Sequence, residues 1–275
     1  MLSYQHEYHA GNHADVLKHW LLVECLLYLQ EKDNPFDYID THAGSGSYQL
    51  DSKLALKNAE FMGGIERLLE QPVAGMENYL DRIQTSVKAR RYPGSPALVN
   101  ELLRPDDRSW LFELHPQTFT KLHRQCQRKG RTQVRKQDGF QGLLGLLPVA
   151  SRRALVLIDP AYEVKDDYDT VIKVLTQAWK KMPQAIFLLW YPVIDMQRVS
   201  KLEQALRASI IRDVHLIELG VREPAMNTGM TGSGMIVVNP PWTLQARVDA
   251  ILPVLSETLS EDGSSRCRRL CLVPE

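Results

Sequence analysis

The chain has 275 residues, of which 44% are hydrophobic and 24% are charged, a composition that excludes disordered, collagenous and coiled-coil proteins. Its longest apolar stretches, residues 20–29 and 185–194, are shorter than the roughly 18 uncharged residues of a membrane-spanning helix. Basic and acidic residues both number 33, so the net charge indicates no polyanionic partner. The first residues lack the basic and apolar pattern of an export signal, so we expect a cytoplasmic protein.

Short apolar runs alternate with helical patterns along the chain. Six runs are rich in β-branched and aromatic residues, as in buried parallel strands: 36–40, 110–114, 154–159, 185–191, 214–219 and 235–239. Apolar residues recur every three or four positions, as in amphipathic helices, in 14–31, 116–128, 166–181 and 195–208. This alternation predicts an α/β fold, doubly wound around a mainly parallel sheet.

One interval departs from this alternation. About 70 residues separate the first predicted strand from the second, and they contain two amphipathic runs, 54–70 and 76–90. We therefore expect residues 49–92 to form an inserted helical subdomain. Residues 1–48 and 93–275 are expected to form the main domain.

Acidic residues stand where a nucleotide site needs them. Asp40 ends the first strand before a small-residue turn at 43–46, which would let a ligand approach the backbone. Glu113 ends the second strand, where an acid holds ribose hydroxyls in other nucleotide-binding sheets, and Asp138 precedes a glycine turn. Each acid alone is explained by a helix cap or surface position. The turn is no P-loop, and Gln49 breaks the GxGxxG pattern.

The sharpest motif is Asp159-Pro160-Ala161-Tyr162, directly after an apolar run. It is close to the Asp/Asn-Pro-Pro-Tyr/Phe motif of enzymes that methylate the exocyclic amino group of adenine. That nitrogen is a poor nucleophile, so its N–H groups must be held while a methyl donor approaches. The Asp159 carboxylate and the Pro160 carbonyl would hold them, and Tyr162 would stack on the extruded base. The sulfonium of S-adenosylmethionine already activates the methyl group, so orientation suffices without a metal.

A rival copy of the motif is Asn239-Pro240-Pro241-Trp242, which matches the consensus slightly better as a string. It comes late in the order of strands and is expected toward the sheet edge. Asp159 instead follows the strand expected beside the cofactor strand. We therefore assign the chemistry to Asp159, against the alternative of an ordinary proline turn.

A basic segment and a histidine cluster complete the candidate features. Residues 121–136 contain seven cations and no acid, which indicates either a solvated helix face or, beside a cleft, a phosphate-binding surface. Four of the eight histidines lie within residues 6–19, but no acid or cysteine cluster accompanies them, so we expect stacking and hydrogen bonding and no metal site. The four cysteines are scattered and form no CxxC pair.

With these residues collected, the chain resembles, nearly end to end, the RlmJ family of bacterial 23S rRNA adenine-N6 methyltransferases. The most specific part of the resemblance is the histidine-rich block, Ser3-Tyr4-Gln5-His6 and residues 9–19. The other matching segments are Asp40-Thr41-His42-Ala43-Gly44, Tyr92-Pro93-Gly94-Ser95-Pro96, Glu113-Leu114-His115-Pro116, Asp138-Gly139-Phe140, Leu157-Ile158-Asp159-Pro160, Leu189-Trp190-Tyr191-Pro192, and residues 229–231 and 239–242.

The resemblance implies a Rossmann-like class I methyltransferase with an inserted helical subdomain, S-adenosylmethionine as cofactor, and 23S rRNA, bare or in early assembly, as partner. A monomer is compatible with this. The implied catalytic residues are Asp159, Pro160 and Tyr162, and Tyr4 would touch the RNA. The implied cofactor-binding residues are His19, His42, Ser95, Glu113, Asp138, Gly139 and Asp159.

The chain departs from the family pattern at two positions. Ala161 stands where a second proline is expected, which removes a restriction on Pro160 and leaves its carbonyl less firmly fixed. We expect activity to be retained but slower. Gln5 replaces the usual arginine, which affects how the amino-terminal segment meets phosphate and not the methyl chemistry.

Three alternatives stay open at this point. The tetrapeptide does not distinguish DNA from RNA, so adenine-N6 methylation of DNA is one. A catalytically silent nucleic-acid-binding protein, linked to use of external DNA, is another. A nicotinamide-dependent dehydrogenase is the least supported, because Gln49 breaks the dinucleotide fingerprint.

Overall fold

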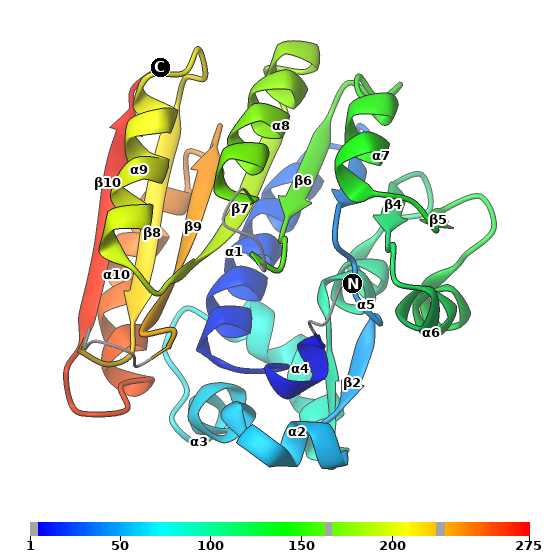
Figure 1. Ribbon diagram of the computed structural model, residues 1–275. Helices are drawn as coiled ribbons and strands as arrows, with labels where there is room; N and C mark the ends of the chain where they lie inside the picture. Colours follow the sequence, from blue (N-terminus) through cyan, green and yellow to red (C-terminus); the bar gives the residue numbers. More distant parts are fainter. Residues whose placement is uncertain (1–4, 163–166, 224–228) are drawn as a thin grey trace.

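A single eight-stranded sheet runs through the centre of the protein, in the strand order β10-β8-β9-β7-β6-β1-β4-β5 (Figure 1). The structure is a computed structural model that describes residues 5–162, 167–223 and 229–275. In chain order the sheet strands are β1 (Asp37–Asp40), β4 (Arg108–Phe112), β5 (Thr132–Arg135), β6 (Ala154–Ile158), β7 (Ile186–Val193), β8 (Val214–Gly220), β9 (Gly232–Val238) and β10 (Arg266–Val273).

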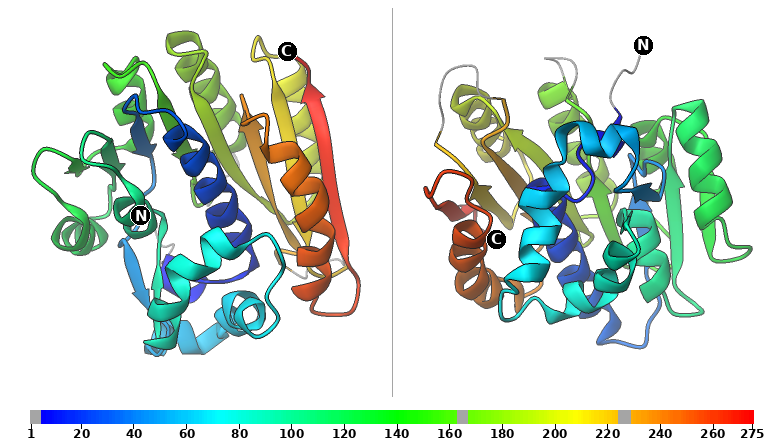
Figure 2. Two further views of the ribbon diagram at one scale, coloured as in Figure 1. Left: turned by 180° about the vertical axis from the view of Figure 1, so that it is seen from behind. Right: turned by 90° about the horizontal axis from the view of Figure 1, so that it is seen from below.

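Helices cover both faces of this sheet, as the alternation of patterns predicts (Figures 1 and 2). One apolar cluster joins the sheet to α7 (Gly139–Leu146), α8 (Asp167–Lys181) and α9 (Met196–Arg207). A second cluster joins the other face to α1 (His13–Gln30), α5 (Ser95–Leu102), α6 (Pro116–Cys126) and α10 (Leu244–Thr258). The expected α/β fold is confirmed. No helix of the described ranges is long and apolar enough to cross a membrane.

Strand direction decides which residues share an edge of the sheet. β1 pairs in parallel with β4 and β6, β4 with β5, and β6 with β7. β9 instead runs antiparallel to β7 and β8, and β10 runs antiparallel to β8. The expectation that residues 235–239 form a parallel strand toward the sheet edge is wrong, because β9 is antiparallel to its neighbours and lies inside the sheet between β8 and β7. The connection from Gly220 to Gly232 is too short for a crossover helix, so β9 returns beside β8 in the opposite direction.

The segment between β1 and α5 forms a layer of its own below α1 (Figure 1). A two-stranded ribbon, β2 (Ser47–Gln49) with β3 (Arg91–Pro93), brings its two ends together. Between them lie α2 (Lys53–Asn58), η2 (Met62–Glu66), α3 (Arg67–Glu70) and α4 (Glu77–Lys88). Their apolar side chains belong to the same cluster as those of α1. The division into a main domain and an inserted helical subdomain stays a prediction.

The start of α1 is fixed by contacts with this layer. Asn12 caps the helix, because its side chain accepts hydrogen bonds from the backbone N–H groups of Ala14 and Asp15. The backbone N–H of Ile65 donates to the Gly11 carbonyl at 2.8 Å. A Cβ atom on Gly64 would lie 2.2 Å from that carbonyl oxygen, so only glycine fits there. These contacts hold the amino-terminal turn of α1 at the carboxyl edge of the parallel strands.

Candidate active site

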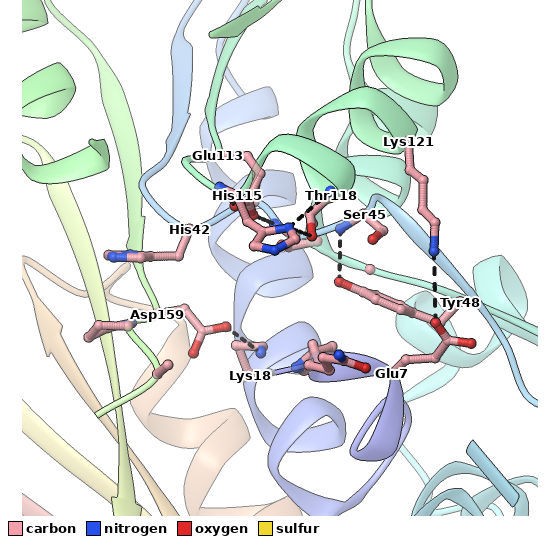
Figure 3. A pocket seen from close by; sticks show the side chains of 18 of the residues that line it. Glu7, Lys18, His42, Ser45, Tyr48, Glu113, His115, Thr118, Lys121 and Asp159 are labelled. Carbon is pink, nitrogen blue, oxygen red and sulfur yellow. Dashed lines mark hydrogen bonds and ion pairs between the residues drawn. The ribbon is translucent and has the colours of Figure 1, made fainter. Parts of the chain in front are cut away.

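A cavity of about 360 Å³ opens at the carboxyl edge of β1, β4 and β6. Because these strands are parallel neighbours, the residues that follow them meet there. The cavity is lined by side chains from distant parts of the chain (Figure 3). They include these predicted site residues: His19, His42, Ser95, Glu113, Asp159 and Pro160.

Glu113 forms one wall of the cavity, just beyond β4. Its two carboxylate oxygens accept hydrogen bonds from the backbone N–H groups of Gly44, at 3.1 Å, and His115, at 2.7 Å. Burial raises the pKa of the Glu113 carboxyl above its usual value. The turn beside it needs glycine, because Gly44 has φ +63° and a Cβ atom would lie 2.2 Å from the Tyr48 hydroxyl. This arrangement presents a fixed carboxylate to a hydroxylated ligand such as a ribose.

Asp40 lies behind the cavity wall and does not line the cavity. It accepts hydrogen bonds from the hydroxyl groups of Tyr38 and Ser95, both at 2.7 Å. Complete burial raises the pKa of the Asp40 carboxyl to about 6. Asp40 also accepts a hydrogen bond from the backbone N–H of His42 at 3.3 Å, so this acid positions two residues that line the cavity, Ser95 and His42.

Two histidines contribute uncharged rings to the cavity. The Nδ1 atom of His19 lies 2.8 Å from the Tyr92 hydroxyl, and burial lowers the pKa of His19 to about 3. His42 packs edge-on against Phe140, and burial lowers its pKa as well. Both rings are therefore neutral at pH 7 and offer hydrogen bonds and stacking surface to a ligand without adding charge.

Asp159 is held by a buried lysine from α1. The Nζ atom of Lys18 lies 2.6 Å from the Asp159 carboxylate and 2.8 Å from that of Asp15, and the Lys18 side chain is only 4% exposed (Figure 3). Burial alone would lower the pKa of Lys18, but the two carboxylates hold it well above the usual value. The Oδ2 atom of Asp159 takes the lysine contact, and its Oδ1 atom accepts no hydrogen bond from any described residue.

Sequence analysis did not single out Lys18. It stands three residues after Asp15 on α1, a spacing typical of helical ion pairs. Its pairing with Asp159, 141 positions away, depends on the tertiary fold. The only sequence signal was its place in the histidine-rich block.

A second cavity of about 190 Å³ adjoins the first. Both are lined by Asp159, Lys18 and Trp190, so the Asp159 carboxylate lies between them. Tyr162 lines the smaller cavity only, with φ +51°, and its hydroxyl donates to the Trp190 carbonyl at 2.7 Å. Its ring also contacts Tyr168. The site therefore has two compartments that meet at one carboxylate.

The other predicted site residues lie elsewhere. Asp138 and Gly139 do not line either cavity. The Asp138 side chain caps α7 by accepting a hydrogen bond from the backbone N–H of Gln141 at 2.8 Å. A Cβ atom on Gly139 would lie 1.8 Å from the Thr41 carbonyl oxygen, so close packing explains this glycine. A cofactor contact for this pair stays a prediction, and Tyr4 lies outside the described residues.

The rival motif lies at the amino ends of the parallel strands, at the opposite end of the sheet from the cavity. Val238 pairs with Phe187 near the start of β7, because β9 is antiparallel to it. Asn239 therefore follows near the amino end of β7, where its side chain donates to the carbonyl groups of Pro183 and Ala185. Trp242 is 79% exposed. Strand direction is therefore what favours Asp159 over Asn239. The sequence had indicated a different reason, namely that Asn239 follows a strand near the outer edge of the sheet.

Comparison with known proteins identifies the family. The model of a family described as "Ribosomal RNA large subunit methyltransferase D, RlmJ" matches residues 33–270. The chain is 43% identical to "Ribosomal RNA large subunit methyltransferase J" of Escherichia coli (strain K12) over the full length of both chains. It belongs to the RlmJ family. The protein of the same name from Haemophilus influenzae is 41% identical over the same coverage.

A solved structure extends this likeness to three dimensions. Protein LPL1258 from Legionella pneumophila superposes with a TM-score of 0.86 at 32% identity, covering 96% of this chain and 98% of that one. As a member of the RlmJ family, the chain is a methyltransferase with a Rossmann-like fold, and S-adenosylmethionine is its cofactor.

The larger cavity fits this cofactor. Its volume lies in the range of roughly 300–1,000 Å³ typical of small-molecule sites. Glu113 would hold the ribose hydroxyls through its carboxylate oxygens, and the uncharged ring of His42 and the hydroxyl of Ser95 line other walls. S-adenosylmethionine, when bound, supplies a methyl group activated by a sulfonium. Asp159 lines this cavity and the smaller one beside it.

Proposed function

We propose that this chain transfers the methyl group of S-adenosylmethionine to the N6 amino group of an adenine in 23S rRNA. The observation that carries the proposal is the Asp159 carboxylate, which lies between two adjoining cavities and keeps its Oδ1 atom free of described partners. The larger cavity takes the cofactor, and the smaller one takes the extruded adenine.

The residues around Asp159 orient the amino group. Oδ1 of Asp159 accepts one N–H of the adenine, and the Pro160 carbonyl accepts the other, which directs the nitrogen toward the cofactor compartment. Lys18 holds the carboxylate in place through its contact with Oδ2. Tyr162 and Trp190 line the smaller cavity and give the base aromatic surfaces for stacking.

Ribosomal RNA as the substrate is supported by the relatives. The two full-length relatives from Escherichia coli and Haemophilus influenzae are named as large-subunit ribosomal RNA methyltransferases. The substrate of this chain is accordingly 23S rRNA, free of protein or early in assembly. The reaction then takes place in the cytoplasm, where bacterial ribosomes are made.

Radiolabelled methyl transfer tests the proposal. The wild-type chain, tritiated S-adenosylmethionine and protein-free 23S rRNA should give N6-methyladenine, identified in nuclease digests. Asp159→Asn should lower the single-turnover rate by about 10²–10³-fold, because the lost charge weakens the hydrogen bond that orients the amino group. Asp169→Asn, at an exposed position on α8, is the matched control and should react at the wild-type rate.

Two results would overturn the proposal. One is the absence of N6-methyladenine, and the other is undiminished product from Asp159→Asn. A DNA oligomer with the sequence of the methylated RNA segment belongs in the same experiment. Equal turnover on that DNA would favour DNA methylation as the function.

A further inference from the structure

The outer edge of the sheet carries an uncompensated positive surface. We call it the basic edge. It lies on α6, on β5, in the connection between them and at the residue after β5, and it consists of Lys121, Arg124, Arg128, Lys129, Arg131, Arg135 and Lys136. All of these side chains except Arg131, which is half-buried, are exposed. β5 is the last strand of the sheet, so no further strand covers this flank.

The basic edge lacks the acidic partners found elsewhere in the protein. Of its seven cations, only Lys121 forms an ion pair with a described residue, a loose one with Glu7 at 4.0 Å. The other arginine-rich stretch behaves differently, because on β10 Arg266, Arg268 and Arg269 each pair with a carboxylate. A chain with equal numbers of acidic and basic residues thus concentrates unpaired positive charge at one flank.

This surface begins at the rim of the active site. Lys121 lines the larger cavity, and Figure 3 places it with Glu7 beside that opening. From there α6 leads away from the cavity, and its rise of about 1.5 Å per residue carries Arg124 roughly 5 Å farther, with Arg128 in the connection that follows the helix. β5 returns to the rim, where the Arg135 carbonyl accepts a hydrogen bond from the backbone N–H of Glu113.

We propose that the basic edge binds the phosphate backbone of the RNA strand that flanks the target adenine. The inference rests on the proposed function, because a base extruded into the site leaves its neighbouring phosphates outside, within reach of this flank. Lysine and arginine contacts to phosphates position a nucleic acid without reading its sequence. They also make binding depend steeply on salt, because each neutralised phosphate releases counterions.

Charge removal tests the inference. The variant Arg124→Gln, Arg128→Gln, Lys129→Gln changes three exposed residues that form no ion pair with a described residue and line neither cavity. The matched control is Lys173→Gln, Lys180→Gln, Lys201→Gln, three exposed lysines on α8 and α9, across the sheet from α6. Binding to an RNA fragment containing the methylated adenine is measured between 50 and 200 mM salt, together with steady-state methyl transfer.

The variant should bind RNA about tenfold more weakly near 100 mM salt, and its slope of log K against log salt should fall by about 2, since a single strand gives about 0.7 per contact. The KM for RNA should rise while kcat, S-adenosylmethionine affinity and melting temperature stay at wild-type values. The control should match the wild type throughout. A variant whose RNA affinity and salt slope equal those of the control would overturn the inference. If the wild type shows a steeper slope of log K against log salt than the variant but transfers no methyl group, the proposed function fails and the assignment of the basic edge to RNA binding stands.

Discussion

Lys18 contacts two carboxylates at once, the buried one of Asp15 and that of Asp159. Burial opposes the ionisation of Asp15, but the charges of His6 and Lys18 hold its pKa well below the usual value. A carboxyl with a depressed pKa stabilises the folded state above its unfolded pKa, and this stabilisation is lost as the pH falls through the folded value. The stabilisation due to Lys18 is therefore expected at neutral pH and not in acid.

Lys18→Met should accordingly lower the free energy of unfolding by about 3 kcal/mol at pH 7, because it leaves two facing carboxylates without their cation. Below about pH 4 the gap to the wild type should narrow, since the carboxyls of the variant become protonated. Urea denaturation at pH 7 and at about pH 3 measures this difference, with the exposed Lys180→Met as control. If the two proteins differ by the same free energy of unfolding at pH 7 and at about pH 3, Lys18 stabilises by packing and not by charge.

Ala161 is the second residue whose replacement is informative. Its backbone N–H donates no hydrogen bond within the described part of the chain, so a proline there costs no such bond. Ala161→Pro should restrict Pro160 and fix its carbonyl toward the amino group. We expect the single-turnover rate to rise about threefold, the equivalent of about 0.6 kcal/mol of backbone ordering.

Ala161→Gly is the matched control, because it loosens the same backbone position and should slow methyl transfer. The measurement is a rapid-quench time course with enzyme in excess over RNA. An unchanged or lower rate for the proline variant would refute the link between backbone rigidity and rate.

At the scale of elements, the layer between β2 and β3 supports the start of α1 through Glu60. The Glu60 carboxylate lies 2.9 Å from Nδ1 of His9 and accepts a hydrogen bond from the Asn12 side chain at 2.9 Å. Asn12 in turn caps the helix that carries Lys18. This layer thus fixes the amino-terminal turn of α1, the helix that places Lys18 beside Asp159.

Glu60→Gln should slow methyl transfer and lower stability in a pH-dependent way. The hydrogen bond to Glu60 raises the pKa of His9, so the stabilisation from this pair is complete below pH 6.5 and is lost as the pH rises through the folded value. The free energy of unfolding that the variant loses should therefore be larger at pH 6 than at pH 8.5. The loss should be only a few tenths of a kcal/mol, because both groups are partly exposed. Thermal unfolding at both pH values, with Glu70→Gln as control, measures it. An equal penalty at both pH values would exclude the ionic contribution.

The elements that sequence reasoning missed have physical reasons for being inconspicuous. β5 contains one strongly apolar residue, Val134, so it lacks the hydrophobic run that marks a buried strand. α7 contains three glycines, yet a Cβ atom on Gly142 would lie 2.2 Å from the Phe112 ring. Packing therefore overrides helix propensity there. α10 contains Pro253 in its interior, and a proline there locally predicts the end of a helix.

The sequence predicts those residues of the candidate site that follow directly on a strand. It does not predict the contacts that depend on tertiary packing. Glu113 and Asp159 line the cavity because each directly follows a parallel strand. The alternation of apolar runs with helical patterns in the sequence is enough to predict those strand ends. Asp40 does end its strand, but burial directs its carboxylate to Ser95. The contact of Lys18 with Asp159 depends on how α1 crosses the sheet, which no local pattern encodes.

At the scale of the whole molecule, strand direction separates two similar tetrapeptides. Asp159 and Asn239 both follow buried strands, but β6 and β9 run in opposite directions, so the two motifs lie at opposite edges of the sheet. Tyr162 should therefore matter for methyl transfer and Trp242 should not. Trp242→Ala should keep the wild-type rate within about twofold, as is usual for an exposed residue, whereas Tyr162→Ala should lose most of it.

Single-turnover methyl transfer to 23S rRNA measures both variants, with S-adenosylmethionine affinity as a check on folding. A large loss of rate in Trp242→Ala would place part of the chemistry at the opposite edge. That result would contradict the assignment of the active site to the carboxyl edge of the parallel strands.

The role of Asp159 in adenine methylation is tested most directly in cells, by mass spectrometry of 23S rRNA from a strain that lacks this chain. One N6-methyladenine should be missing there. Expression of the wild-type chain should restore it, and expression of Asp159→Ala at the same level should not. An unchanged N6-methyladenine content in the deletion strain, or full restoration by Asp159→Ala, would contradict the account.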